Sequence, residues 1–127
     1  MTRYRKNIGD YGEELASQFL TKRGYTIVAR KFASLYGELD IVALHPEHTD
    51  TLCCIEVKTR LTDAFGSPEE AITREKIKRL HDTACSYFFQ HNVEDKIFRL
   101  DAISILINSV TKKAIIKHIK GIGYEDL

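Results

Sequence analysis

Three segments with the composition of β-strands follow one another after a single amphipathic helix. The helix is expected over residues 8–23, where apolar side chains recur at three- and four-residue spacing and Gly24 follows as the C-terminal cap. The strands are expected over residues 25–32, 38–44 and 52–60. Three consecutive strands behind one helix argue against a continuous β-α-β-α-β array and favour a mixed sheet.

The second half of the chain adds a helix and two strands. Residues 67–70 combine a serine, a proline and a glutamate in the pattern of a capping box, and Thr73 is a candidate cap for a segment that runs to about His91. Its apolar face is expected to contain Ile77, Leu80, Ala84, Tyr87 and Phe88. Residues 97–107 and 114–119 are expected to form a hairpin. The order α-β-β-β-α-β-β predicts an α/β fold with a mixed β-sheet flanked by helices.

The length of 127 residues suits one domain, and the chain shows no repeat, linker or low-complexity segment. A single domain is therefore expected over residues 1–127. Residues 1–7 are interpreted as a basic arm and residues 120–127 as a tail, and both are candidates for flexible segments. Two features have open interpretations. His118 is expected at the surface or at a sheet edge, and the basic stretch of residues 74–79 is either a solvated helix face or a strip that contacts phosphates.

Composition excludes several classes of protein. Nineteen Lys and Arg residues against eighteen Asp and Glu residues give a net charge of +1, which excludes binding of nucleic acid by bulk charge but not by a local basic patch. The longest nearly apolar run, residues 102–107, is too short to span a membrane, and no apolar core of a signal peptide is visible. Cys53, Cys54 and Cys85 are expected to be small buried thiols of a cytoplasmic protein with no membrane partner.

Charged residues interrupt two of the expected strands at positions that share a face, because strand side chains alternate between faces. On the second strand Glu38, Asp40 and Val42 are expected on one face, and Leu39, Ile41 and Ala43 on the other. On the third strand Cys54, Glu56, Lys58 and Arg60 share a face. A short loop joins these strands, so they are expected to be antiparallel neighbours roughly 4.8 Å apart. Asp40 and Glu56 can then lie side by side, with Lys58 two residues further on.

A pair of carboxylates in an otherwise apolar sheet is costly unless a cation compensates the charge. Oxygen ligands suit Mg2+ or Mn2+, and such an ion can hold a phosphate oxygen and activate a bound water. Lys58 would orient that water or offset charge in the transition state. Asp40, Glu56 and Lys58 together fit metal-assisted hydrolysis of a phosphodiester. The alternative is structural: Glu56 and Lys58 form a solvated ion pair on an exposed strand face, and Asp40 only caps or pairs.

Glu13 lies at the edge of the apolar face of the first helix. In that position its carboxylate can lean toward the sheet and reach a metal ion. A second interpretation is equally open, because Glu13 and Glu14 also complement the positive end of the helix dipole.

The motifs, taken in order, resemble a known family. They are Gly9-x-x-Gly12-Glu13-x-x-Ala16, Gly37-Glu38-x-Asp40-Ile41, Ile55-Glu56-Val57-Lys58-Thr59-Arg60, Phe65-Gly66-x-Pro68, Lys76, Ala84 and Arg99-x-Asp101. Together they resemble the YraN-like family of small bacterial proteins predicted to be endonucleases. That family is similar to the archaeal Holliday-junction resolvases of the PD-(D/E)xK nuclease superfamily. The resemblance covers the chain from about Gly9 to Ile119.

The resemblance implies a restriction-endonuclease-like core and a Mg2+- or Mn2+-dependent endonuclease that acts on DNA, including branched or structured DNA. The metal ligands of the superfamily fall on Asp40, Glu56 and Glu13, and its catalytic lysine falls on Lys58. Glu38, Arg60, Lys76 and Arg99 match positions with less clear roles, and Leu39 stands where some members have a proline. A homodimer is compatible with this resemblance, since junction resolvases cut two strands symmetrically. The alternative is a nuclease fold that binds nucleic acid or recruits a partner without cutting, because fold alone does not establish activity.

Overall fold

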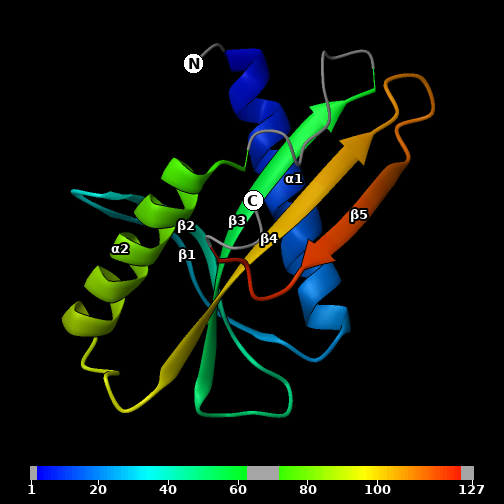
Figure 1. The fold of residues 1–127 in the computed structure, drawn as a ribbon. Helices are drawn as coiled ribbons and strands as arrows, with labels where there is room; N and C mark the ends of the chain where they lie inside the picture. The colour runs from blue at the N-terminus through cyan, green and yellow to red at the C-terminus, as the bar shows by residue number, and fades with distance from the viewer. Residues whose placement is uncertain (1–2, 63–71, 124–127) are drawn as a thin grey trace.

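The computed structural model describes residues 3–62 and 72–123. Within these ranges the elements are α1 (Arg3–Lys22), β1 (Thr26–Ser34), β2 (Gly37–Leu44), β3 (Thr51–Leu61), α2 (Arg74–Gln90), β4 (Ile97–Ile107) and β5 (Ala114–Ile119). The expected order α-β-β-β-α-β-β is confirmed, and Figure 1 shows the strands as one twisted sheet. The capping-box pattern of residues 67–70 lies outside the described residues.

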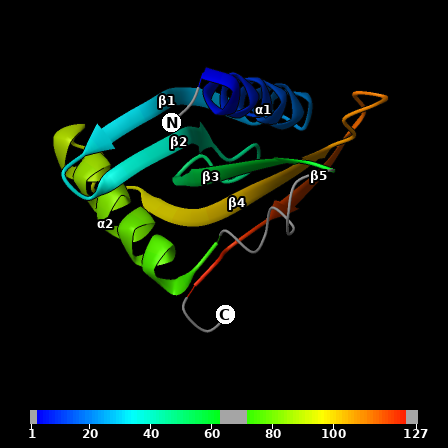
Figure 2. The same ribbon diagram turned by 90° about the horizontal axis from the view of Figure 1, so that it is seen from above.

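The sheet has the strand order β1-β2-β3-β4-β5. All neighbouring pairs are antiparallel except β3 and β4, which are parallel. A parallel pair needs a long crossover between its strands, and α2 lies in that crossover. Figure 2 shows α1 and α2 on opposite faces of the sheet, so the fold is a mixed sheet between two helices, as the sequence predicts.

Each helix packs on its own apolar cluster. The cluster beneath α1 contains Ala16, Leu20, Tyr25, Ile41, Ala43, Cys53, Ile55, Ile103, Ile105 and Ile107. The cluster beneath α2 contains Leu39, Val42, Leu52, Cys54, Ile77, Leu80, Ala84, Tyr87, Phe88 and Leu100. The apolar face expected for the second helix is therefore confirmed. Thr73 caps that helix, because its Oγ1 accepts a hydrogen bond from the Lys76 N–H at 3.3 Å.

Two expectations need correction. The first helix begins at Arg3 rather than Ile8, because no glycine or proline precedes Gly9 to stop it, so residues 3–7 are helical and not a separate arm. The described part of the expected tail includes Ile122, whose N–H donates to the Leu100 carbonyl at 2.7 Å. Cys53 and Cys54 are buried as expected, but Cys85 is exposed because it lies on the outer side of α2.

Leu39 also departs from the expected alternation, since it packs beneath α2 while Ile41 packs beneath α1. The neighbouring strand departs from alternation at the same level, where Lys31 has a positive φ of 55°. The adjacent residues Arg30 and Lys31 both reach acidic side chains of α1.

Helix α1 approaches β3 closely at one glycine. A methyl group at Gly12 would overlap the side chain of Thr59. We expect Gly12→Ala to destabilise the protein by about 1–3 kcal/mol, because the helix must move off the sheet to relieve the overlap. Urea unfolding measures the loss. Gly9→Ala is the matched control, because a methyl group there meets no atom and should stabilise the helix slightly. An unchanged free energy of unfolding for Gly12→Ala would contradict the close packing.

None of the helices in the described ranges is long and apolar enough to cross a bilayer.

Candidate functional site

The sheet opens between β2 and β3. Their ladder runs from Leu44 and Leu52 to Ile41 and Ile55 and ends there. Beyond that point β2 continues along β1 and β3 continues along β4. Asp40 and Glu56 are the next residues after the last pair. The two carboxylates therefore stand where the neighbouring strands part, which confirms the expected juxtaposition.

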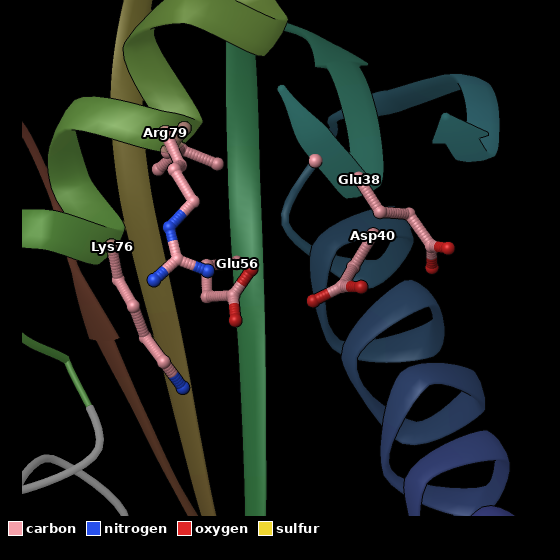
Figure 3. Close-up of a pocket in the computed structure, with 7 residues that line it drawn as sticks. Glu38, Asp40, Glu56, Lys76 and Arg79 are labelled. Carbon is pink, nitrogen blue, oxygen red and sulfur yellow. The ribbon is translucent and has the colours of Figure 1, made fainter. Parts of the chain in front are cut away.

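A pocket of about 240 Å³ lies at this opening. It is lined by Gly37, Glu38, Asp40, Glu56, Lys76, Arg79 and Leu80. Figure 3 shows Glu56 on β3 between Asp40 on one side and the two cations of α2 on the other, while the Glu38 carboxylate is turned away from Glu56. The pocket thus combines strand carboxylates with helix cations.

The Asp40 side chain is held by the backbone of β3, the strand from which β2 separates at this point. Its Oδ2 accepts a hydrogen bond from the Val57 N–H at 2.7 Å, in place of a partner from the ladder. Burial and the nearby Glu56 carboxylate raise the pKa of Asp40 to about 8, and the more distant Glu13 and Glu38 add to this. The hydrogen bond from Val57 opposes the shift but is outweighed. Asp40 is therefore largely protonated at neutral pH and would ionise when a cation arrives.

Glu56 and Lys58 share a face of β3 as expected. The Lys58 Nζ lies 3.1 Å from the Glu56 Oε1, and both side chains are partly buried, with 24% and 20% of their surface exposed. Burial lowers the pKa of Lys58, but the Glu56 and Asp40 carboxylates outweigh it and the pKa is raised overall. Lys58 is therefore positively charged at neutral pH. A solvated ion pair on an exposed face does not describe this arrangement.

Lys76 brings a second ammonium group to Glu56 from α2. Burial lowers the pKa of Lys76, and repulsion from Lys58 lowers it further. The basic stretch is therefore divided: Lys76 and Arg79 line the pocket, while Lys78 is exposed on another side of the helix. The spacing carries part of this signal, because Arg79 and the buried Leu80 follow Lys76 by three and four residues and so lie one turn from it on the helix.

Glu13 is buried, with 5% of its surface exposed, but it does not line the pocket. Its Oε2 lies 3.2 Å from the Lys31 Nζ, and its Oε1 lies 3.5 Å from the Arg30 Nε. The Oε1 makes no hydrogen bond. The structure thus places Glu13 near Asp40, whose pKa it helps to raise, but with its carboxylate on the cations of β1.

The metal that the sequence predicts would need several oxygen donors close together. Across residues 3–62 and 72–123, no three His, Cys, Asp or Glu side chains are gathered closely enough to hold an ion as they stand. Two observations nevertheless fit a cation. Asp40 has a raised pKa because it is buried beside the Glu56 carboxylate, and the buried Glu13 Oε1 has no hydrogen-bond donor. The oxygen donors fit Mg2+ or Mn2+ in type, with Asp40 and Glu56 as the ligands nearest the pocket.

A second polar cluster lies on β4 and β5. The fully buried Asp101 accepts hydrogen bonds from the Arg99 Nε and Nη2, each at 2.8 Å, and from the Gly121 N–H at 3.0 Å. The His118 Nε2 is 2.8 Å from the same carboxylate. The edge position of His118 is confirmed, but its side chain is buried against Asp101 and is not at the surface. The Tyr25 hydroxyl accepts from Arg99 at 3.1 Å and completes the cluster.

Comparison with known proteins identifies the family. The model of uncharacterised protein family UPF0102 matches residues 12–105, which include all of β2, β3 and α2. The chain belongs to family UPF0102. This is the family to which the motif pattern points. UPF0102 proteins of Syntrophomonas wolfei and Beutenbergia cavernae are similar along almost the whole chain. The first is 42% identical over 90% of this chain and 95% of the relative, and the second is 37% identical over 95% and 99%. A UPF0102 protein of Clostridium acetobutylicum is 38% identical over 85% of this chain and 86% of the relative.

Proposed function

We propose that this UPF0102 protein is a metal-dependent endonuclease that hydrolyses phosphodiester bonds of DNA, including branched or structured DNA. The observation that carries the proposal is the opening between β2 and β3. There two strand carboxylates face one pocket with the partly buried cations Lys58 and Lys76 beside them. Carboxylates for a divalent ion next to cations for a phosphate are the donor set that phosphodiester hydrolysis needs.

Asp40 and Glu56 would hold Mg2+ or Mn2+, and Glu13 would support the site from α1. Such an ion supplies an activated water and a fixed position for a phosphate oxygen. Lys58, whose pKa is raised, stays protonated and offsets negative charge that develops on the phosphate. Lys76 and Arg79 approach from α2 and would hold the phosphates on either side of the cleaved bond.

One observation favours a second candidate function. Glu56 is engaged by Lys58, and Glu13 is engaged by Arg30 and Lys31, so two of the three acidic groups already have cations. A module that binds nucleic acid or recruits a partner without cutting it would suit that arrangement. Such a module would bind DNA equally with and without a divalent ion, whereas the endonuclease requires one.

The test is cleavage of duplex, flap and four-way-junction DNA by the purified protein with Mg2+ or Mn2+. We expect cleavage that depends on the metal. Asp40→Asn should lower the rate by roughly 10²–10³-fold or more, since it removes a proposed metal ligand. Lys76→Met should lower it by roughly 10²-fold, since it removes a cation that positions the phosphates. Lys78→Met is the matched control on the exposed side of α2 and should keep the wild-type rate.

An Asp40→Asn protein that cleaves as fast as the wild type would contradict the proposal. So would a wild-type protein that cuts none of these DNAs with either metal. The proposal also includes a cytoplasmic location, which suits the three free cysteines, and a homodimer that would present two sites to two strands.

A further inference from the structure

The turn between β1 and β2 carries two large apolar side chains that remain exposed in the folded protein. The ladder of this hairpin ends at Ser34 and Gly37, so Leu35 and Tyr36 form the tip. Leu35 is 99% exposed and Tyr36 is 52% exposed. Two-residue hairpin loops ordinarily take asparagine, aspartate and glycine, because those residues suit both the turn and water. A leucine and a tyrosine in this position gain no burial, so folding does not explain them.

The tip adjoins the pocket of the proposed site. Gly37 and Glu38, the residues that follow the tip, line that pocket. Gly37 also lies against α2, where a Cβ would be 3.4 Å from the Thr83 Oγ1 and 3.9 Å from the Arg79 Cβ. Figures 1 and 2 both show the hairpin end beside α2. Two residues span at most about 7 Å, so Leu35 lies within roughly one nucleotide step of the pocket edge.

The tip is also held in place. The β1–β2 ladder reaches its base, and the Ser34 Oγ accepts a hydrogen bond from the Tyr36 N–H at 3.1 Å. A fixed apolar and aromatic pair beside a basic strip is the combination that proteins use for unpaired nucleotides: cations follow the phosphates, and rings and apolar wedges contact the bases. Lys76 and Arg79 supply the cations here.

We propose that Leu35 and Tyr36 contact an unpaired or unstacked base next to the phosphate held in the pocket. The substrate class is then DNA in which a base is accessible, as at a branch, a gap or a strand end, and continuous duplex is a poor ligand. This inference rests on the proposed function, because it takes the pocket as the place of the phosphate. A second copy of the chain is the competing occupant of the tip.

The test is binding without cleavage, measured by fluorescence anisotropy in EDTA. One DNA is a duplex with a short gap that carries 2-aminopurine, and the other is a continuous duplex of the same sequence. We expect the wild type to bind the gapped DNA more tightly and to change the 2-aminopurine fluorescence. The double variant Leu35→Ser/Tyr36→Ser should bind the gapped DNA roughly 5- to 100-fold more weakly, the range expected for the loss of one base-stacking contact. Its affinity for the continuous duplex should stay the same.

Two controls sharpen the result. Tyr36→Phe keeps the ring and should keep the preference for gapped DNA. Val110→Ser changes a side chain that is 87% exposed in the turn between β4 and β5, and it should have no effect. Equal binding of both DNAs by the wild type would overturn the inference, as would unchanged gapped-DNA binding by the double variant. A wild-type dimer that becomes a monomer in the double variant, measured by sedimentation, would assign the tip to self-association and also overturn it.

The two proposals fail in different ways. If the wild type cuts DNA with metal and the double variant cuts gapped DNA equally well, only the base contact is wrong. If tip-dependent binding of gapped DNA is found but no metal supports cleavage, the base contact stands and the endonuclease proposal is wrong.

Discussion

Asp40→Asn is expected to abolish the binding of Mg2+ or Mn2+ and, at the same time, to stabilise the metal-free protein at alkaline pH. The wild-type side chain is buried beside Glu56, which raises its pKa to about 8. Above that pH the folded protein must hold a charge that its surroundings disfavour. Asparagine removes this charge, and its amide oxygen can still accept the hydrogen bond from the Val57 N–H. The variant should therefore lose a ligand and gain stability, which a generally damaging substitution would not do.

The pH dependence of the protein's stability follows from the raised pKa of Asp40. The unfolded chain loses the Asp40 proton near pH 4, whereas the folded protein keeps it to about pH 8. The folded state is favoured by this group at low pH, and that advantage is lost as the pH rises between these two values. The difference in Tm between Asp40→Asn and the wild type should thus be small near pH 5 and should grow toward pH 9. Calorimetric melting at both pH values measures it.

Metal binding should release a proton for the same reason. At neutral pH Asp40 is largely protonated, and it must ionise to act as a ligand. We expect about one proton to leave when Mn2+ binds at pH 7, and fewer at pH 9. Titration calorimetry in two buffers with different ionisation enthalpies counts these protons. Metal binding without proton release at pH 7 would show that Asp40 is already ionised or is not a ligand.

Asp101→Ala is expected to cause the largest loss of stability, about 3–5 kcal/mol. Asp101 is fully buried and pairs with Arg99, His118 and the Gly121 N–H. Its removal would leave the buried His118 side chain and the partly buried Arg99 guanidinium without this acceptor. Urea unfolding at neutral pH measures the loss. Asp95→Ala, at an exposed position before β4, is the matched control and should change the free energy of unfolding by no more than about 0.5 kcal/mol.

The loss of stability caused by Asp101→Ala should be smaller in acid. Burial alone would raise the pKa of Asp101, but His118 and Arg99 outweigh burial and lower it. A carboxyl group with a lowered pKa in the folded state adds stability above its unfolded pKa near 4, and this stability is lost as the pH falls through the folded value. The difference between Asp101→Ala and the wild type should therefore shrink in acid. An equal difference at pH 7 and below pH 3 would contradict a charged Asp101.

The elements of the fold and the centre of the site could be predicted from sequence because they depend on local periodicity. The strand alternation of β3 places Glu56 and Lys58 on one face whatever the rest of the chain does. The short connection to β2 then makes Asp40 the neighbour of Glu56. Both inferences depend on the spacing of residues within a strand and on the length of one short connection. The structure confirms that Asp40, Glu56 and Lys58 are placed in this way.

The errors concern choices that only tertiary packing makes. The positive φ of Lys31 is not encoded by a glycine, so neither it nor the pairing of Lys31 with Glu13 could be read from the sequence. His118 looks like a surface residue until the β4–β5 hairpin places its side chain on Asp101 and beside Tyr25. Lys76 could be assigned to the pocket only once it was known which side of α2 faces the opening.

The opening between β2 and β3 creates two strand edges in the interior of the sheet. Edges at the outside of a sheet are liable to pair with the strands of other molecules, and proteins protect them. Here the inner edges are short, they lie between α1 and α2, and the Asp40 carboxylate occupies one of their backbone donors. These inner edges therefore leave little room for a strand of another chain to pair there. A bulky apolar residue at position 40 would leave the Val57 N–H without this acceptor, so aggregation on expression is a hazard for such variants.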